Sequence, residues 1–515
     1  MDHEPITLRL SRETDWKPVN VSFGTSGWRA VIGEAFTPEN IGLVVQAIAD
    51  CLNDQGLTGS IILGRDPRTL GEEGIQRAAV ILAAHGLDPV VGKAYTPTPV
   101  ISHAITHHQA VGGINLTASH NPGNWNGIKF NPAHGGPAGK AITDEIERRT
   151  NGYMKRKHPE IRLYQDYEAA VRSGKIAEVD LLPAYLDDLK RVIDFDTIRG
   201  SDLRLIADPM NGAGIRAYQW IFEALGGSQE DILHATPDPD FRGLSPEPAE
   251  AHLGELIDRV KRASGQALGI AGDPDVDRFG IVDRDGSYIT PNQFIAIALR
   301  YLYEVRGYRG GAAKSVATTD LINAVAESLG IPIYETAVGF KWFTDHLRPG
   351  SGHPVILAGE ESGGLSIRDW VLEKDGILAG VLAAEIVART GKSLKQHLDE
   401  IQQQVGYYVY HRDNIPLTDR LRDEIPERFD RLVEEVATGG TVEIAGKPVA
   451  RSIAVDGWKF LFEDKSWLLV RLSGTEPVAR LYTEATSKQG PEAAARALEA
   501  LRDAGKQLLG LGNKH

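Results

Sequence analysis

A short apolar run, a polar turn and an amphipathic helical stretch follow one another three times along this chain. The apolar runs lie at residues 60–68, 203–214 and 312–320, and apolar residues at helical spacing come after each of them. Buried strands that alternate with helices at this rhythm are typical of α/β units with largely parallel strand pairing. We therefore expect three similar mixed α/β domains.

The C-terminal part departs from this rhythm. Short strand candidates (TVEIAG, RSIAVDG and SWLLVRLSG) are grouped there, and the helical stretch EAAARALEALRDAGKQLLG follows them. Grouped strands with flanking helices indicate a smaller α+β domain. A chain of 515 residues exceeds what one hydrophobic core usually supports. The expected domains are 1–190, 191–305, 306–408 and 409–515, and we expect 151–200 to be a helical linker.

Charge and cysteine content exclude several classes of protein. The 56 Lys and Arg against 70 Asp and Glu give a net charge of −14, which argues against broad binding to nucleic acid or membrane surfaces. An anionic substrate stays possible, because backbone amides can bind phosphate. Cys51 is the only cysteine, so neither an intrachain disulfide nor a thiolate metal cluster can form. Without an apolar signal core or a membrane-length apolar run, we expect a cytoplasmic protein.

The segment TASHNPGNWNGIK, residues 117–129, is the strongest chemical signal. Ser119 stands between small residues in a turn-rich segment, so we expect its hydroxyl on an exposed loop. His120, Asn121 and the neighbouring backbone amides can surround a phosphate on that hydroxyl. Lys129 is expected on the next strand, where it offers a positive charge. The alternative is an ordinary surface loop that contains a serine.

Three alternating carboxylates follow in AGDPDVDRFG, residues 271–280. Asp273, Asp275 and Asp277 fall on one side of an extended or tightly turned segment. Such a cluster is costly without a cation, and Mg²⁺ prefers these hard oxygen ligands. The glycine and glutamate spacing of a calcium-binding EF-hand loop is missing. The alternative is a polar turn with Arg278 as its counter-ion.

Three weaker segments suggest contacts to a phosphorylated sugar. In AGEESGG, Glu360 and Ser362 alternate on a glycine-rich loop that suits sugar hydroxyls. FGTSGWRA, residues 23–30, adds a flexible turn with Arg29. RLSGTEPVAR forms a compact anion-binding candidate. Its residues are Arg471, Ser473, Gly474, Thr475 and Arg480. An ordinary capped turn or glycine turn is the alternative for each.

Taken in order, these five segments resemble those of the α-D-phosphohexomutase superfamily, which includes phosphoglucomutases, phosphomannomutases and phosphoglucosamine mutases. The resemblance covers nearly the whole chain, and the TASHNP and DPDVDR motifs are highly specific in that order. It implies an α/β fold of three similar domains, followed by a smaller α+β domain, around a central cleft. Each domain would contribute one motif to that cleft.

The resemblance also implies specific roles. Ser119 would be the phosphoserine, and its phosphate would hold one Mg²⁺ together with Asp273, Asp275 and Asp277. The residues implied or nominated to bind substrate are Arg278, Lys341, Glu360, Ser362, Arg471, Ser473, Gly474, Thr475 and Arg480. Catalysis would involve Ser119, His120, Lys129, Arg29 and Lys374.

Two positions bear on the general acid or base. Some dual-specificity relatives carry a histidine where Gly364 stands, whereas glucose-specific relatives carry a Lys-Asp-Gly segment that Lys374 to Gly376 match. We therefore nominate Lys374, with Arg29 and His120 as further candidates. Lys341 matches a substrate-contacting position of the glucose enzymes.

The implied reaction interconverts α-D-glucose 1-phosphate and glucose 6-phosphate through glucose 1,6-bisphosphate. The pair Glu360-Glu361 is similar to the glucose-type sugar loop. A phosphomannomutase or a dual-specificity enzyme is the alternative, and pentose phosphates come third. Two other classes are a metal-assisted phosphatase, which needs a second metal site, and a non-catalytic phosphosugar-binding protein. The only expected partner is the small phosphosugar, and the chain is expected to be a monomer or a homodimer.

Overall fold

A computed structural model describes residues 4–11, 16–24, 26–473 and 477–511. The chain divides into two compact units. Unit one comprises Met1–Pro291, Phe343–Ser351 and Ser362–Ser393. Unit two comprises Asn292–Trp342, Gly352–Glu361 and Leu394–His515.

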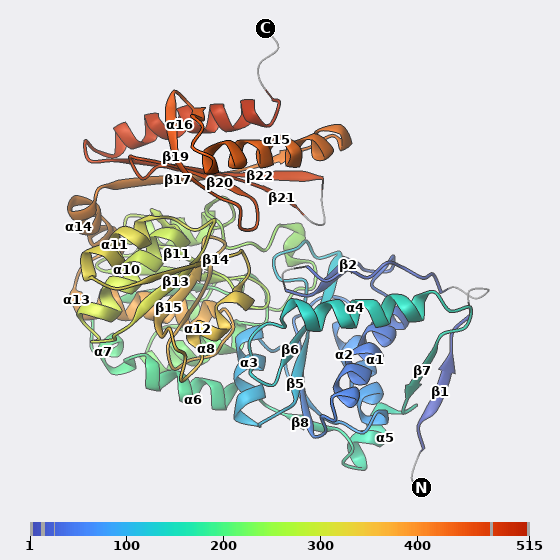
Figure 1. Ribbon diagram of the computed structural model, residues 1–515. Coiled ribbons are helices and arrows are strands. Elements are labelled where there is room, and N and C mark those ends of the chain that lie inside the picture. The colour runs from blue at the N-terminus through green and yellow to red at the C-terminus, as the bar shows by residue number, and fades with distance from the viewer. Residues whose placement is uncertain (1–3, 12–15, 25, 474–476, 512–515) are drawn as a thin grey trace. The chain divides into compact units, whose positions relative to one another are not determined.

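The first sheet of unit one has six strands in the order β2-β6-β5-β3-β4-β8. Their bounds are β2 Trp28–Val31, β3 Ser60–Arg65, β4 Asp88–Gly92, β5 Gly112–Leu116, β6 Trp125–Pro132 and β8 Ala177–Val179. Figure 1 shows α3 on one side of this sheet and α1 and α2 on the other. The helices around it are α1 Pro38–Asp54, α2 Gly71–Ala84, α3 Thr98–His107 and α4 Lys140–Met154. The core between sheet and helices is aliphatic, which matches the expected α/β unit.

The second sheet of unit one has four strands in the order β12-β11-β10-β9. Their bounds are β9 Arg204–Asp208, β10 Ala267–Gly272, β11 Phe279–Val282 and β12 Tyr288–Ile289. Its helices are α8 Ile215–Leu225, α9 Gly254–Arg262 and α13 Gly376–Thr390. Short elements complete the unit: η1 Gln229–Asp231, η2 Phe241–Gly243, η3 Glu250–His252, α12 Thr344–Leu347 and β16 Gly364–Ile367.

The expectation of a helical linker over 151–200 is wrong in part. The segment contains α5 Tyr167–Arg172, α6 Leu182–Val192 and α7 Phe195–Arg199, but also the strands β7 Glu160–Leu163 and β8. Strand β7 pairs with β1 Ile6–Arg9, and β8 extends the first sheet beside β4. Both strands are short and surrounded by charged residues, so their apolar pattern is weak.

Unit two contains a parallel group of three strands, ordered β14-β13-β15. The strands are β13 Gly311–Ser315, β14 Ile333–Thr336 and β15 Val355–Glu360. The associated helices are α10 Pro291–Glu304, α11 Leu321–Leu329, η4 Phe340–Trp342 and α14 Leu394–Val405. This is the third of the expected strand–turn–helix units.

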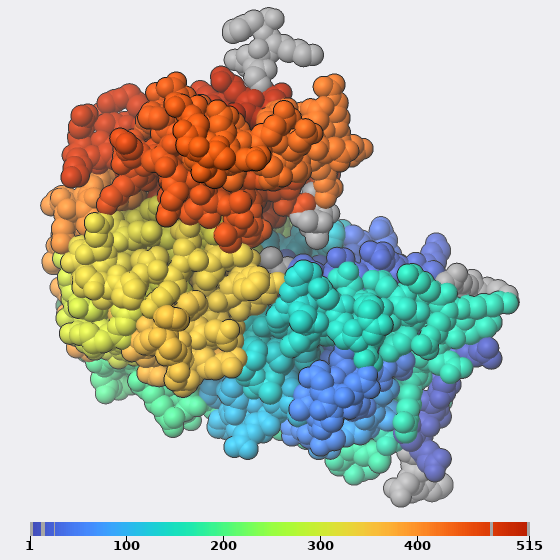
Figure 2. All heavy atoms as spheres, in the orientation of Figure 1, coloured from blue at the N-terminus to red at the C-terminus, as the bar shows by residue number. Residues whose placement is uncertain are grey.

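The last sheet of unit two is antiparallel, with the order β17-β22-β21-β20-β19-β18. Its strands are β17 Tyr407–Pro416, β18 Glu443–Ile444, β19 Lys447–Ile453, β20 Trp458–Phe462, β21 Trp467–Leu472 and β22 Val478–Ser487. Helices α15 Asp419–Ala437 and α16 Pro491–Leu508 lie on one face (Figure 1). Phe429 of α15 and Leu501 of α16 are fully buried there, while the outer residues of α15 form exposed surface, orange in Figure 2. The expected α+β domain is confirmed.

Strand pairing is less parallel than expected where the chemical motifs occur. Strands β3, β4, β5 and β8 pair in parallel, but β6 is antiparallel to β5, and β11 is antiparallel to β10. The segment TASHNP connects β5 to β6, and DPDVDR connects β10 to β11. Both motifs are therefore short loops between neighbouring antiparallel strands. No helix among the described residues is long and apolar enough to cross a membrane.

Candidate active site

A buried arginine shapes the loop that carries Ser119. The guanidinium of Arg68 donates hydrogen bonds to the carbonyl oxygens of Ser119 (2.5 Å), Asn121 (2.6 Å), Pro122 (2.6 Å) and Trp125 (2.8 Å). Five donors in one rigid plane allow a single side chain to hold several carbonyls at once. This loop is consequently fixed in shape by a residue that lies far from it in the sequence.

Ser119 itself is fully buried, so the expectation of an exposed loop serine is wrong. Its backbone adopts φ 52°, a left-handed conformation that costs a non-glycine residue about 1–2 kcal/mol. The hydroxyl Oγ donates to Asp273 Oδ2 at 2.7 Å and lies 3.3 Å from His120 Nδ1. Backbone strain of this kind concentrates at functional sites.

The aspartate loop, residues 273–278, turns sharply between β10 and β11. Val276 at its centre adopts φ 52°, which is unfavourable for a β-branched residue. Asp273 Oδ1 accepts a hydrogen bond from the backbone N–H of Arg278 at 3.0 Å. The guanidinium of Arg278 pairs with Glu247 at 3.2 Å. This tight turn aims all three carboxylates of the loop at one region.

Two lysines neutralise part of this charge. Lys129 Nζ lies 2.5 Å from Asp275 Oδ2 and 2.5 Å from Asp277 Oδ2, and Lys374 Nζ lies 3.0 Å from Asp277 Oδ2. Burial disfavours the charge of Asp277, but Lys129, Lys374 and Arg278 hold its pKa well below the usual range. Burial likewise opposes the charge of Lys129, yet Asp275 and Asp277 raise its pKa.

Two oxygens of these carboxylates have no hydrogen-bond partner among the described residues. They are Oδ1 of Asp275 and Oδ1 of Asp277, and both are buried. Burial, and then repulsion by Asp275 and Asp277, raises the pKa of Asp273 well above its usual range. Oxygens from the three carboxylates lie within 4.8 Å of one another. Unpaired buried oxygens in this number fit a hard divalent ion such as Mg²⁺.

His120 and Arg29 lie beside the same loops. Burial, reinforced by Arg278 and Arg29, lowers the pKa of His120 well below its usual range, which favours the neutral imidazole. Arg29 on β2 donates to Asn121 Oδ1 at 2.7 Å, and burial lowers its pKa. The structure thus brings the predicted catalytic residues of unit one together: Ser119, His120, Lys129, Arg29 and Lys374.

The segment expected to bind the sugar, residues 358–364, has residues in both units. In unit two, Glu360 Oε1 accepts a hydrogen bond from the backbone N–H of Gly339 at 2.7 Å, which ties the end of β15 to the loop that carries Lys341. Glu361 accepts from Ser315 and Thr318, each at 3.1 Å. Ser362 lies half-buried in unit one. These contacts orient Glu360 and Lys341 within one part of unit two.

The predicted anion site of unit two rests on two arginines. Arg471 on β21 and Arg480 on β22 stand directly opposite each other in the antiparallel register. Like charges in that position are unfavourable unless something negative lies near them. Arg471 donates to Asp456 Oδ2 at 2.6 Å, and the N–H of Ser473 donates to the carbonyl of Val478 at 2.9 Å. Gly474 and Thr475 lie outside the described residues.

Sequence reasoning missed several residues that organise the site. Besides Arg68, these include Thr98, whose Oγ1 donates to Asp275 Oδ2 at 2.5 Å, and Thr117, whose Oγ1 donates to Asp66 Oδ2 at 2.6 Å. Asp66 in turn pairs with Arg68 at 3.1 Å. The charged sequence RDPR at 65–68, directly after an apolar run, is the one local signal that could have pointed to Asp66 and Arg68.

Comparison with known proteins matches four successive parts of the chain to domain families. Four domain families described as phosphoglucomutase/phosphomannomutase match in order: α/β/α domain I at 20–157, α/β/α domain II at 183–286, α/β/α domain III at 290–405 and the C-terminal domain at 421–503. The matched domains confirm three α/β domains followed by a fourth.

Individual relatives extend over most of the chain. A phosphoglucomutase of Komagataeibacter xylinus is 32% identical, over 90% of this chain and 87% of that protein. The crystal structure of a putative phosphomannomutase from Thermus thermophilus is 30% identical, with a TM-score of 0.79, over 96% of this chain and 100% of that one.

A structure of parafusin, a phosphoglucomutase from Paramecium in an open form, is 27% identical with a TM-score of 0.81 and covers 99% of this chain and 97% of that one. The resemblance that the motifs indicated is therefore confirmed over nearly the full length. This chain belongs to the phosphoglucomutase/phosphomannomutase family.

Proposed function

We propose that this protein interconverts α-D-glucose 1-phosphate and glucose 6-phosphate through a phosphorylated Ser119. The observation that carries this proposal is the buried Ser119 Oγ, 2.7 Å from Asp273 Oδ2, beside carboxylate oxygens that lack partners among the described residues. A phosphate on that hydroxyl and the three aspartates would together hold one Mg²⁺. When bound, this ion would offset negative charge on the transferring phosphoryl group.

The transfer requires a nucleophile, a leaving group and a proton acceptor. A free hydroxyl of the sugar monophosphate attacks phosphorus as the P–O bond to Ser119 breaks, which gives glucose 1,6-bisphosphate. The general base takes the proton of that hydroxyl, and Ser119 Oγ regains a proton as it leaves. The bisphosphate turns end for end, and its original phosphate returns to Ser119. Lys129, held between Asp275 and Asp277, stays charged and helps to hold the phosphoserine. Burial of Ser119 limits the access of water, which favours transfer over hydrolysis.

Lys374 is the proposed general acid or base, and its side chain packs against Gly364. A Cβ added at Gly364 would lie only 2.4 Å from Lys374 Cδ, so glycine at 364 leaves space for the lysine stem. Lys374 Nζ is directed to Asp277 at 3.0 Å. His120, which is neutral and 3.3 Å from Ser119 Oγ, and Arg29 are the other candidates.

The remaining motifs are proposed to bind the substrate. In unit one, Arg278 and Ser362 would contact it, and in unit two, Glu360 and Lys341 would read its hydroxyls. The phosphate that is not reacting would bind at Arg471, Ser473, Gly474, Thr475 and Arg480. The opposed arginines of β21 and β22 support this anion site, because an anion would relieve their repulsion.

Glucose is the proposed sugar, with mannose 1-phosphate as the second candidate. Glu360 and Glu361 are both fixed by hydrogen bonds within unit two, as expected of a preformed sugar loop. The second candidate is supported by the similarity to a protein described as a putative phosphomannomutase. Domain bounds of 1–190, 191–305, 306–408 and 409–515, a cytoplasmic location and a monomeric or homodimeric state remain predictions.

The test is turnover of α-glucose 1-phosphate with Mg²⁺ and a trace of glucose 1,6-bisphosphate, with mannose 1-phosphate in parallel. Glucose 6-phosphate and free phosphate are both measured. We expect fast glucose 6-phosphate formation without free phosphate. Release of free phosphate would instead identify a phosphatase. Absence of both products from protein whose Ser119 is phosphorylated, as checked by mass, would refute the mutase assignment.

The Lys374→Ala variant tests which of the candidate residues is the general acid or base. If Lys374 moves the proton, kcat falls and one limb of the pH–rate profile is lost, while KM changes less. Lys140→Ala is the matched control, because Lys140 forms an exposed helix pair with Asp144. An unchanged pH profile in Lys374→Ala would transfer the role to His120 or Arg29.

A further inference from the structure

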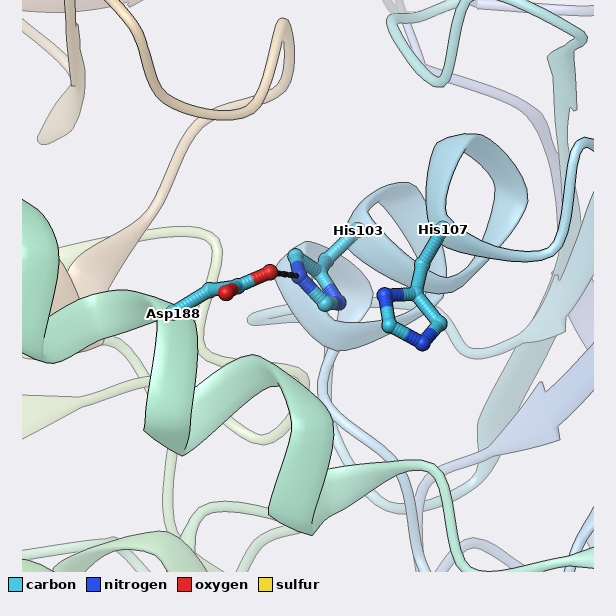
Figure 3. A group of neighbouring side chains, drawn as sticks. All are labelled: His103, His107 and Asp188. Carbon is cyan, nitrogen blue, oxygen red and sulfur yellow. Dashed lines mark hydrogen bonds and ion pairs between the residues drawn. The ribbon is translucent and has the colours of Figure 1, made fainter.

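A second group of metal-binding side chains lies in unit one, outside the site described above. His103 and His107 are one helical turn apart on α3, and Asp188 lies on α6 beside them (Figure 3). A spacing of four residues places both imidazoles on the same face of a helix. Potential ligand atoms from the three residues lie within 4.8 Å of one another.

One ring nitrogen of His103 already has a hydrogen-bond partner. Its Nε2 lies 2.8 Å from Asp188 Oδ2, and this carboxylate also pairs through Oδ1 with Arg191 at 3.2 Å. A carboxylate acceptor fixes the proton on Nε2, so the neutral imidazole keeps a lone pair on Nδ1. This arrangement of carboxylate and histidine is the one that commonly orients a metal ligand.

The other nitrogen of His103 is left without a partner. The side chain is 9% exposed, and Nδ1 has no hydrogen-bond partner among the described residues. Figure 3 shows that this nitrogen faces the ring of His107, and the ring centroids are 5.3 Å apart. A buried polar atom without a partner is uncommon and calls for an explanation.

Aromatic side chains pack around His103 and hold its ring in place. Tyr185 meets the ring edge-on at 5.8 Å, and Trp370 lies at 6.1 Å. His107 is exposed, which gives an ion a path from solvent and room for water ligands.

We propose that His103 Nδ1 and the imidazole of His107 bind a divalent transition-metal ion of the Zn²⁺ type, and that Asp188 orients His103 through its Nε2. Imidazole nitrogen suits Zn²⁺, Cu²⁺ and Ni²⁺ and is a poor ligand for Mg²⁺, so this site is chemically distinct from the aspartate loop. Because Asp188 belongs to α6, the ion would strengthen the connection between α3 and α6.

The test is calorimetric titration of the full-length protein with ZnCl2 in the presence of excess Mg²⁺, which occupies the aspartate loop. We expect one Zn²⁺ to bind and to raise Tm. His107→Gln is expected to abolish this binding, since the exposed position tolerates the change. Asp188→Asn is expected to weaken it roughly 10–100-fold, as loss of an orienting carboxylate does.

His108→Gln is the matched control, because His108 is also exposed and its ring lies 5.3 Å from that of His107. It should leave Zn²⁺ affinity unchanged. Unchanged affinity in His107→Gln, or an equal loss in His108→Gln, would overturn the proposal. Binding is read without any activity assay, so the outcome is independent of the proposed mutase reaction.

Discussion

Two groups of buried charges, one in each unit, consist of similar residues but differ in their pairing. The aspartate-loop cluster of unit one contains Asp273, Asp275 and Asp277 with Lys129 and Lys374. The lysine cluster of unit two contains Lys314 and Lys459 with Asp320, Glu335 and Glu484. Each cluster therefore brings two lysines to three carboxylates.

In the lysine cluster, the charged groups are closely partnered. Lys314 Nζ lies 2.5 Å from Asp320, 3.0 Å from Glu335 and 3.0 Å from the carbonyl oxygen of Thr318. Lys459 Nζ lies 3.2 Å from Glu335 and 4.3 Å from the centre of the Trp467 ring. Lys314 lies on strand β13 and Lys459 on strand β20.

The aspartate-loop cluster instead has strained backbone at Ser119 and Val276, and oxygens on Asp275 and Asp277 that are unpaired among the described residues. Buried charge that is closely paired on strands is structural. Buried charge that is left partly unpaired on strained loops is ready for a ligand.

The largest expected difference is in activity. Ser119→Ala should lower turnover by about 10⁴-fold or more, because the phosphoryl carrier is gone. Stability should fall by only about 1 kcal/mol, from the lost hydrogen bond to Asp273. Ser173→Ala at the end of α5 is the control and should keep full activity. Substantial remaining turnover would mean that another residue carries the phosphate.

In the lysine cluster the largest effect should be on stability. Lys314→Met removes a positive charge that pairs with Asp320 and Glu335 inside the protein. The free energy of unfolding should therefore drop by about 3–5 kcal/mol. Lys465→Met removes an exposed pair with Glu327 and should cost about 0–1 kcal/mol. Urea unfolding measures both, with hydrogen exchange of β13 to locate the loss. Equal effects of the two variants would contradict a structural role for the cluster.

The lysine cluster should also make stability depend on pH through Glu484. Burial, and then Asp320, raises its pKa to about 7, and its carboxyl accepts from Trp467 Nε1 at 2.8 Å. A raised pKa means that the folded state binds the proton more tightly than the unfolded state. This stabilisation is complete below the unfolded pKa near 4.5 and is lost as pH rises to about 7.

The stabilisation that protonated Glu484 contributes should fall by on the order of 3 kcal/mol over this pH range. It is measured as the unfolding free energy of the wild type minus that of Glu484→Gln between pH 4.5 and 7.5. A difference that does not fall with rising pH would show that Glu484 is ionised throughout.

The smallest expected change in stability is a gain and not a loss. Asp273→Asn removes one of three mutually repelling carboxylates, so without metal the protein should gain about 1 kcal/mol of stability. Activity should fall, because a proposed ligand is lost. Tm with EDTA and with Mg²⁺ gives the comparison: Mg²⁺ should stabilise the wild type more than the variant. A variant less stable than wild type in EDTA would mean that the carboxylates do not repel.

Local sequence predicted most of the reacting groups. Ser119, Lys129 and the three aspartates stand within two short motifs, so their types and spacing could be read directly. Strand–turn–helix alternation likewise predicted the α/β units, because hydrophobic periodicity reflects which face of each element is buried. Strands β7 and β8 were not predicted, since they are short and gain stability from neighbours that are distant in sequence.

Tertiary structure alone decided how these groups are held. Arg68 reaches the carbonyl of Ser119 across 51 sequence positions, and His103 meets Asp188 across 85. No local pattern contains such contacts. The burial of Ser119 and the unpaired oxygens of Asp275 and Asp277 also depend on packing. The sequence by itself determined which chemical groups are present in each loop, because side-chain chemistry is local. Their burial, pairing and pKa values came only with the fold, because these properties depend on the surrounding residues.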